Sequence, residues 1–256
     1  MRKIIDFHTH PFIDSSQNIK RYKDEADYAL DIIREDEERA GISMICGSVL
    51  HVCEESLDTM LKSNADAFAY HEKNPDFYIP GIQVNPNYIE ESCKEIDRAA
   101  SRGLYLIGEI NPKCMAYERY DDSRLLEILA YAAERGMTVS CHSMTDEEMD
   151  NLAAALPQLS IVNAHPGELA RLDAHIERMQ KYENVHLDLS GTGLFRYGML
   201  RYILDKVGKE KVLFGTDYPV CNPAMYVEGV LYEKLSAAEE DAVFYDNAAR
   251  LLKIGE

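Results

Sequence analysis

The sequence predicts a single-domain α/β protein with a (β/α)8 TIM-barrel fold. Eight short apolar or β-branched runs alternate with segments of helical periodicity over 256 residues. Parallel strands need crossover helices that bury both faces of the sheet, and eight such repeats are typical of this barrel. No Ser- or Gly-rich linker divides the chain, so we expect residues 1–256 to form one domain. A doubly wound open sheet is the alternative, and the number of strands favours the barrel.

The expected strands all end in polar or turn residues, as strands that lead into loops do. In chain order they are KIIDFH (3–8), ISMICG (42–47), FYIPGIQV (77–84), GLYLIGEI (103–110), MTVSCH (137–142), SIVNAH (160–165), NVHLDLS (184–190) and KVLFGTD (211–217).

Apolar residues at helical spacing predict helices between the strands. The clearest sets are Leu57, Met60, Leu61 and Phe68, then Leu125, Leu126, Leu129, Ala132 and Ala133, and finally Ala242, Val243 and Ala249. Two helix starts also carry capping signals. Ser236 and Glu239 form a capping-box pattern, and the acids Asp121 and Asp122 precede Ser123 at a second helix entrance.

Composition limits the partners of this protein. A formal charge of −18 and a pI near 4.8 repel nucleic acid and anionic membranes, and no stretch approaches the roughly 20 apolar residues of a membrane span. The cysteines show no C-x-x-C spacing, which favours reduced thiols in the cytosol; they are Cys46, Cys53, Cys93, Cys114, Cys141 and Cys221. We therefore expect a cytoplasmic protein with a small-molecule substrate and no nucleic-acid or membrane partner, with a homo-oligomer as a possible assembly.

Two histidines, His8 and His10, stand at the end of the first expected strand. Side chains of a strand alternate between its faces, so His8 and His10 project the same way, with Asp6 behind them. The pair could bind one metal ion, and the alternative is a hydrogen-bonded structural pair.

Other strand ends decide between these interpretations. Glu109, His142, His165 and Asp217 lie at or next to the carboxyl ends of the fourth, fifth, sixth and eighth expected strands. Active sites of this barrel form at that face. Buried imidazole and carboxylate groups gathered in one mouth would cost several kcal/mol without partners. One or two metal ions would supply those partners.

The sequence resembles the amidohydrolase superfamily of metal-dependent hydrolases over its whole length and in the family's order. The matching motifs are DFHTH (6–10), GEI (108–110), CHS (141–143), NAHPG (163–167), LDLSG (187–191), LFGTDYP (213–219) and NAARLL (247–252). LDLSG and LFGTDYP resemble the branch with amidohydrolase-related hydrolases and zinc-dependent non-oxidative decarboxylases. Glu109 instead resembles TatD-like hydrolases, where a strand-four glutamate bridges two metals. Relatives with a carboxylated lysine at this position use chemistry that this chain lacks.

This resemblance implies a divalent metal, with zinc expected first, as one or two ions per chain. The implied ligands are His8, His10, Glu109, His142, His165 and Asp217. Zinc in such a ligand set lowers the pKa of a coordinated water to about 7 and polarises a carbonyl oxygen. Asp217 is expected to transfer protons, and His165 to stabilise an oxyanion or donate a proton. Two alternatives stay open: Glu109 could hydrogen-bond a ligand instead of bridging, and His165 could act without binding metal.

Several other polar residues receive structural interpretations. His186 and Asp188 are expected to be packed interior residues, Cys141 a small buried apolar residue, and His51, His71 and His175 surface or core histidines. The loops at the catalytic face carry basic residues that could hold an anionic substrate group, although solvent-facing charge is the simpler explanation for each. These residues are Lys20, Arg21, Lys113, Arg119 and Arg196, of which Lys113 and Arg196 are the preferred substrate-binding candidates.

The leading hypothesis is therefore a metal-dependent hydrolase that cleaves a C–N or C–O bond in a small, anionic amide, lactone or ester. A zinc-dependent non-oxidative decarboxylase or hydratase on the same scaffold is the alternative. A TatD-like nuclease is disfavoured by the negative charge. A non-catalytic metal-binding protein is disfavoured because a closed structural site needs no open coordination position.

Overall fold

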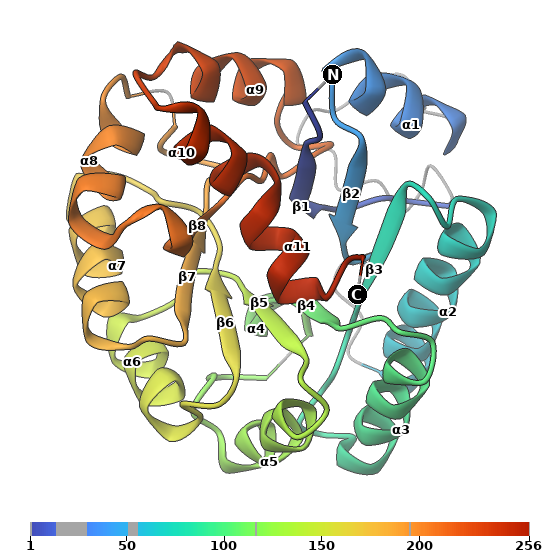
Figure 1. Cartoon of the computed structure of the whole chain (residues 1–256). Helices are drawn as coiled ribbons and strands as arrows, with labels where there is room; N and C mark the ends of the chain where they lie inside the picture. The colour runs from blue at the N-terminus through green and yellow to red at the C-terminus, as the bar shows by residue number, and fades with distance from the viewer. Residues whose placement is uncertain (1, 14–29, 51–55, 116, 195, 256) are drawn as a thin grey trace.

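The computed structural model confirms the predicted barrel (Figure 1). It describes residues 2–13, 30–50, 56–115, 117–194 and 196–255. The strands form one parallel sheet in the order β1 to β8, and backbone hydrogen bonds join its last strand to its first. Phe7 N donates to Phe214 O at 2.9 Å, and Asp217 N donates to His8 O at 2.8 Å.

All eight expected strands are present, most of them shorter than their apolar runs. They are β1 (Ile5–Thr9), β2 (Met44–Gly47), β3 (Tyr78–Ile82), β4 (Leu106–Ile110), β5 (Thr138–Cys141), β6 (Ser160–Asn163), β7 (Val185–Asp188) and β8 (Val212–Leu213). The run 211–217 shortens most, because the residues after Leu213 hydrogen-bond to the β1 segment outside a regular ladder: Thr216 N donates to Asp6 Oδ1, and Asp217 N to His8 O.

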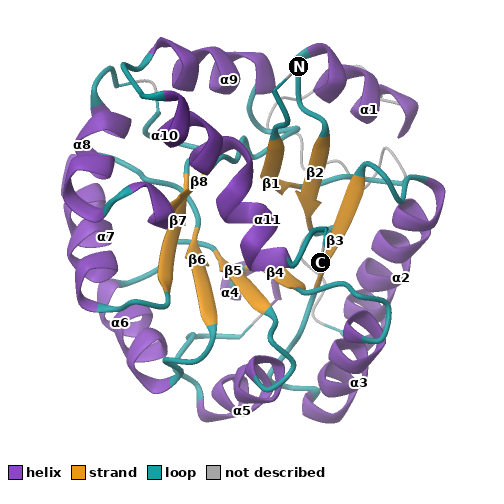
Figure 2. Ribbon diagram, in the orientation of Figure 1, coloured by secondary structure: helices purple, strands orange, loops and turns teal. Residues whose placement is uncertain are grey.

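Helices follow the strands and surround the sheet (Figure 2). They are α1 (Leu30–Arg39), α2 (Leu57–Lys73), α3 (Ile89–Ala100), α4 (Pro112–Met115), α5 (Ser123–Ala133), α6 (Asp146–Ala155), α7 (Leu169–Lys181), α8 (Met199–Val207), α9 (Pro223–Tyr232), α10 (Ala237–Asp241) and α11 (Asn247–Leu252). The predicted capping box at Ser236 is present, and Asp122 caps α5. The last predicted helix is three consecutive pieces, because a π-helical turn (Ala242–Asp246) joins α10 to α11.

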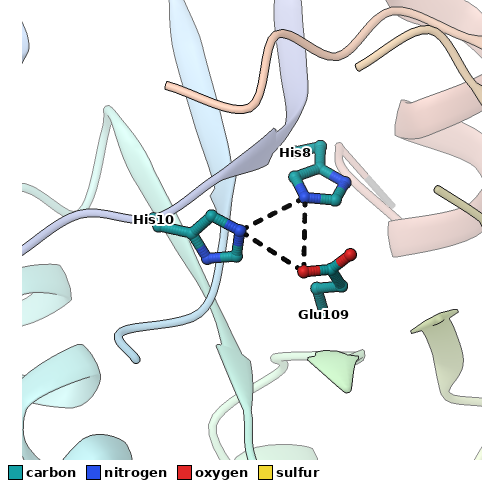
Figure 3. Close-up of side chains that lie close together, drawn as sticks. All are labelled: His8, His10 and Glu109. Carbon is teal, nitrogen blue, oxygen red and sulfur yellow. Dashed lines mark hydrogen bonds and ion pairs between the residues drawn. The ribbon is translucent and has the colours of Figure 1, made fainter. Parts of the chain in front are cut away.

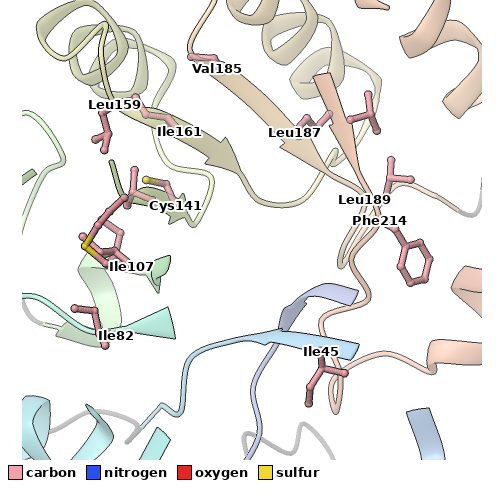
Figure 4. Close-up of a cluster of buried hydrophobic side chains, with 14 of the residues drawn as sticks. Ile45, Ile82, Ile107, Cys141, Leu159, Ile161, Val185, Leu187, Leu189 and Phe214 are labelled. Carbon is pink, nitrogen blue, oxygen red and sulfur yellow. The ribbon is translucent and has the colours of Figure 1, made fainter. Parts of the chain in front are cut away.

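Two apolar layers hold the barrel together. The larger layer lies between strands and helices and includes Ile45, Ile107 and Cys141, so the prediction that Cys141 is a buried apolar residue is confirmed (Figure 4). The smaller layer joins strand residues such as Phe7 to Leu251 of α11, which crosses one end of the barrel (Figure 1). Burial of this kind contributes about 25 cal/mol per Å² of apolar surface.

The end opposite α11 carries the polar residues of interest, because parallel strands bring all their carboxyl ends to one face. Among the residues that the structure describes, no helix combines the length and the apolar character that crossing a bilayer requires.

Candidate metal centre and active site

Six predicted site residues meet at the carboxyl face of the barrel. Each lies in a strand or within a few residues of its end: His8 and His10 at β1, Glu109 in β4, His142 after β5, His165 after β6 and Asp217 after β8. His8, His10, Glu109 and Asp217 are buried, and the other two are half-buried.

Four donor atoms form a first cluster, and Figure 3 shows three of the side chains that supply them, His8, His10 and Glu109. His8 Nε2 and His10 Nε2 lie 3.3 Å apart, and Glu109 Oε2 lies 3.7 Å from the former and 3.5 Å from the latter. Asp217 Oδ1 lies 3.8 Å from His8 Nε2 and 3.5 Å from His10 Nε2. The donor atoms of His8, His10 and Glu109 therefore lie close enough to hold one ion, and Asp217 Oδ1 approaches both histidine nitrogens.

The hydrogen bond that each Nδ1 atom of His8 and His10 makes shows which ring nitrogen is free to bind a metal. His10 Nδ1 lies 3.1 Å from the carbonyl oxygen of Ser48, which can only accept, so Nδ1 carries the proton. His8 Nδ1 lies 2.9 Å from Asp188 Oδ2 and is a donor for the same reason. When both rings are neutral, each Nε2 atom carries a lone pair, and the two lone pairs face each other. Such an arrangement is stable when a cation lies between them.

The spacing of the first cluster fits a divalent ion. Ligand distances of about 2.1 Å in a tetrahedral site place the donors about 3.4 Å apart, and the five separations above run from 3.3 to 3.8 Å. Imidazole and carboxylate together suit zinc, and carboxylate also suits manganese. The chemistry of the donor set and its geometry therefore both fit a metal ion of this kind.

A second cluster forms around the other oxygen of Glu109. His142 Nδ1 lies 2.8 Å from Glu109 Oε1, and His165 Nε2 lies 3.3 Å from the same oxygen. The far nitrogen of His165 is 3.0 Å from Ser190 Oγ, and this hydroxyl donates its own proton to Asp188. Ser190 Oγ therefore accepts a hydrogen bond from His165 Nδ1, which leaves Nε2 to face Glu109. The three residues also satisfy the proximity expected of a metal site.

Buried carboxylates shift the pKa values of the groups at this centre. Burial alone would lower the pKa of His8, but Asp188 and Glu109 outweigh it and raise that pKa to about 10. Burial raises the pKa of Glu109, yet the charge of His8 and hydrogen bonds from neighbouring imidazoles hold it well below its usual range. The site therefore stabilises positive charge at its centre, as a cation-binding site must.

Backbone conformation also marks two of these residues. His165 and Asp217 have φ angles of 68° and 72°, in the left-handed region that costs non-glycine residues energy. Gly191, which has a φ of 65°, packs against one of them: a Cβ added to it would collide with the His165 ring. The strain therefore coincides with the cluster, as it often does at functional sites.

A pocket of about 600 Å³ opens beside the metal cluster. Its walls include His142, His165, Asp217 and one cation, Arg171 of α7. The preferred candidates from the sequence do not line it: Arg196 is exposed and pairs with Glu168, and Lys113 is exposed on α4.

Other basic and histidine residues lie away from this pocket or outside the described part of the chain. Arg119 pairs with Asp121 at 2.7 Å, and Lys20, Arg21 and His51 lie outside the described residues. His175 is buried, as a core histidine should be.

Sequence reasoning missed what Asp188 and Ser190 do. Asp188 is buried at the end of β7, as expected of a packed interior residue, and it also orients His8 and accepts a hydrogen bond from Ser190 Oγ. His186, two residues earlier, is also buried, and within the described part of the chain its Nδ1 has no hydrogen-bond partner. The position of Asp188 at a strand end could have indicated its role, because Asp188 is the last residue of β7 and Glu109 is the last but one of β4.

We expect Asp188→Asn to weaken metal binding by 10- to 100-fold, the usual effect of losing a carboxylate that orients a ligating histidine. The amide would also point a donor at Ser190 N, which now donates to Asp188 Oδ1 at 2.9 Å. Competition with a chromophoric chelator measures the affinity. His186→Leu is the matched control on the same strand and should leave affinity unchanged; equal affinities for wild type and Asp188→Asn would contradict this role.

Comparison with known proteins gives three findings. The family model described as Amidohydrolase matches residues 5–254. No protein of curated function matches the sequence. Solved structures do match, at identities that show a shared fold.

Decarboxylases are among these structures. The structure of 2,6-dihydroxybenzoate decarboxylase from Rhizobium has a TM-score of 0.80 and 15% identity, with 100% of each chain covered. That of 5-carboxyvanillate decarboxylase from Sphingomonas paucimobilis has a TM-score of 0.68 and 18% identity, with 99% of each chain covered. Dihydroxybenzoic acid decarboxylase from Polaromonas sp. JS666, with bound manganese and the inhibitor 2-nitroresorcinol, has a TM-score of 0.74 and 14% identity, covering 100% of this chain and 98% of that one.

Proposed function

Because this chain belongs to the amidohydrolase family, we propose that it is a metal-dependent enzyme that removes carbon dioxide non-oxidatively from a small carboxylate substrate. The observation that carries this proposal is the first cluster, where His8, His10, Glu109 and Asp217 already have the spacing of one four-ligand ion. The decarboxylases with the same fold, one with bound manganese, support it.

The second cluster supports a single ion as well. The 2.8 Å separation of His142 Nδ1 and Glu109 Oε1 is a hydrogen-bond length, shorter than the roughly 3.4 Å between two ligands of one tetrahedral ion. We infer that His142 Nδ1 donates a hydrogen bond to Glu109 Oε1 in this arrangement. The decarboxylases of the same fold favour the decarboxylase alternative over hydrolysis, the leading hypothesis from the sequence.

Different residues of the chain would hold the metal ion and supply the proton in such a reaction. A divalent ion in the first cluster would act as a Lewis acid toward oxygen atoms of the substrate. His165 Nε2 and Nδ1 both face acceptors, Glu109 Oε1 and Ser190 Oγ, which fits a protonated ring beside the pocket. When the bond to the carboxylate carbon breaks, its electron pair stays on the remaining carbon, which takes a proton from His165, and carbon dioxide leaves.

Hydrolysis is the second candidate, and one observation favours it. Both oxygens of Glu109 face imidazoles, with His8 and His10 on one side and His142 and His165 on the other. If a second ion displaced the proton shared by His142 and Glu109, the glutamate would bridge two ions, as the resemblance to TatD-like hydrolases implies.

Metal analysis and product detection together test the proposal. The enzyme saturated with zinc or manganese should retain one ion per chain and release carbon dioxide from hydroxybenzoates, and protein stripped by a chelator should not. Panels of esters, amides and lactones are assayed for hydrolysis in parallel. Two ions per chain with hydrolysis and no carbon dioxide would reject decarboxylation in favour of the second candidate.

We expect Arg171→Met to raise KM by 10- to 100-fold with a smaller effect on kcat, because a charge-assisted hydrogen bond to an anionic substrate contributes about 1.5–3 kcal/mol. Arg171 is the cation that lines the metal pocket, and its Nη1 donates to Met144 O at 2.9 Å. Steady-state kinetics measure the effect. Lys113→Met removes an exposed charge outside the pocket and is the control; a KM change of the same size there would assign the effect to general charge.

A further inference from the structure

A second pocket lies next to the metal pocket and takes no part in the chemistry described above. It has a volume of about 390 Å³ and lies between the segment after β7 and helix α9. Its walls include Leu194, Tyr197, Met225, Tyr226 and Tyr232. Three of these large side chains are exposed: Tyr197 by 67%, Met225 by 70% and Tyr232 by 79%. Apolar side chains gathered at a hollow mark a binding surface.

Two polar side chains at this pocket, Asn222 and Glu233, are already engaged. Asn222 caps α9 by accepting a hydrogen bond from Ala224 N at 3.0 Å. Glu233 Oε1 accepts from Gly198 N at 2.7 Å, at the start of α8. The surface offered to a ligand is therefore largely hydrocarbon and aromatic, and it suits an apolar group better than a charged one.

The apolar pocket adjoins the metal pocket. Cys221 lines both of them. Tyr226 lies in the apolar pocket, and its hydroxyl donates to the carbonyl oxygen of Gly191, which lines the metal pocket. Cys221 and the Tyr226 hydroxyl therefore lie at the boundary of the two pockets, which an elongated molecule bound at the metal cluster would cross to reach the apolar pocket.

Gly229 provides an independent observation. It lines the pocket from inside helix α9, where glycine costs about 1 kcal/mol relative to alanine. Neither backbone nor packing requires glycine here, because its φ is not in the left-handed region and an added Cβ would lie 3.5 Å from Leu194, an ordinary contact. The missing side chain therefore leaves space in the pocket at the expense of helix stability, which is expected where a ligand uses that space.

We propose that this pocket binds the apolar body of the substrate while the carboxylate of the same molecule lies in the metal pocket. The inference rests on the proposed function, because that function makes the substrate a carboxylate. The substrate class is thus an amphiphilic carboxylic acid with an extended hydrocarbon or aromatic part. The occupant is a small molecule, since the boundary that this hollow shares with the metal pocket distinguishes it from an ordinary protein-docking surface.

Binding of hexanoate, octanoate and decanoate to the metal-loaded protein tests this assignment by calorimetry, without any need for turnover. Affinity should rise by about fourfold for each added methylene, the factor for burying a CH2 group. Gly229→Leu should fill the pocket and abolish this dependence on chain length while leaving hexanoate binding nearly unchanged. Gly229→Ala should raise the melting temperature and weaken decanoate binding, a combination that a purely structural glycine would not give.

Ala238→Leu adds a side chain to the exposed helix α10 and is the control, which should keep the chain-length dependence. Equal affinities for the three acids, or a dependence that survives in Gly229→Leu, would overturn the proposal. So would light scattering that shows a dimer dissociated by Gly229→Leu, because the pocket would then be an interface between two copies. Chain-length dependence that is lost in Gly229→Leu, with no carbon dioxide released from hydroxybenzoates by the metal-loaded protein, would sustain the pocket and reject the decarboxylase function.

Discussion

Asp217→Asn should lower turnover by 10²- to 10⁴-fold at saturating metal, the range typical of groups that act in proton transfer or contact the reacting centre. Asp217 Oδ1 belongs to the first cluster, 3.5 Å from His10 Nε2 and 3.8 Å from His8 Nε2, and the residue also lines the metal pocket. Asparagine keeps the size and one oxygen ligand but loses the charge and the basicity. Activity and bound metal, measured on the same sample, separate these two losses.

If Asp217 chiefly handles protons, the variant should retain its metal and its melting temperature while activity falls. If Asp217 is chiefly a ligand, metal content will fall in step with activity and excess metal will restore part of the rate. The matched control is Asp173→Asn, which removes a carboxylate from helix α7 away from the pocket walls. Turnover near that of wild type in Asp217→Asn would show that neither role belongs to this residue.

Glu109→Gln should weaken binding of the single ion and reduce activity by at least 10²-fold. The carboxylate offers Oε2 to the first cluster and accepts a hydrogen bond from His142 Nδ1 at Oε1. A neutral amide binds metal poorly and cannot offset the buried imidazoles as a carboxylate does. Elemental analysis at graded metal concentrations, together with kinetics, measures both effects.

Glu109→Gln also distinguishes a centre with one ion from a centre with two, when its metal content is compared with that of the wild type. One ion in wild type that is lost more readily in Glu109→Gln fits the mononuclear centre that we propose. A fall from two ions to one fits a bridging glutamate and the hydrolytic candidate. An unchanged metal affinity together with unchanged turnover would remove Glu109 from both schemes. Glu148→Gln is the control, because Glu148 is also a buried carboxylate but lies in the capping box of helix α6. Its substitution should leave metal content unchanged.

The sequence by itself determined the barrel and the residues that meet at the candidate metal centre. Strand-like runs such as 137–142 and 160–165 need only local alternation and turn residues to be visible, and β5 and β6 form inside them. Capping signals are local for the same reason, and the capping box at Ser236 is present. Because parallel strands place their carboxyl ends on one face, His8 and Glu109 could be predicted to meet although 100 residues separate them.

Only the tertiary structure decided how these groups are used. Which nitrogen of His8 faces the centre depends on Asp188, 180 residues away, and the environment of Glu109 Oε1 depends on the rotation of the His142 ring. Substrate contacts differ even more, because loop side chains choose among many rotamers and partners: Arg196 turns to Glu168, while Arg171 lines the metal pocket. Periodicity fixes the position of a residue on an element, but side-chain direction and pairing are set by contacts between distant elements, which a one-dimensional pattern does not contain.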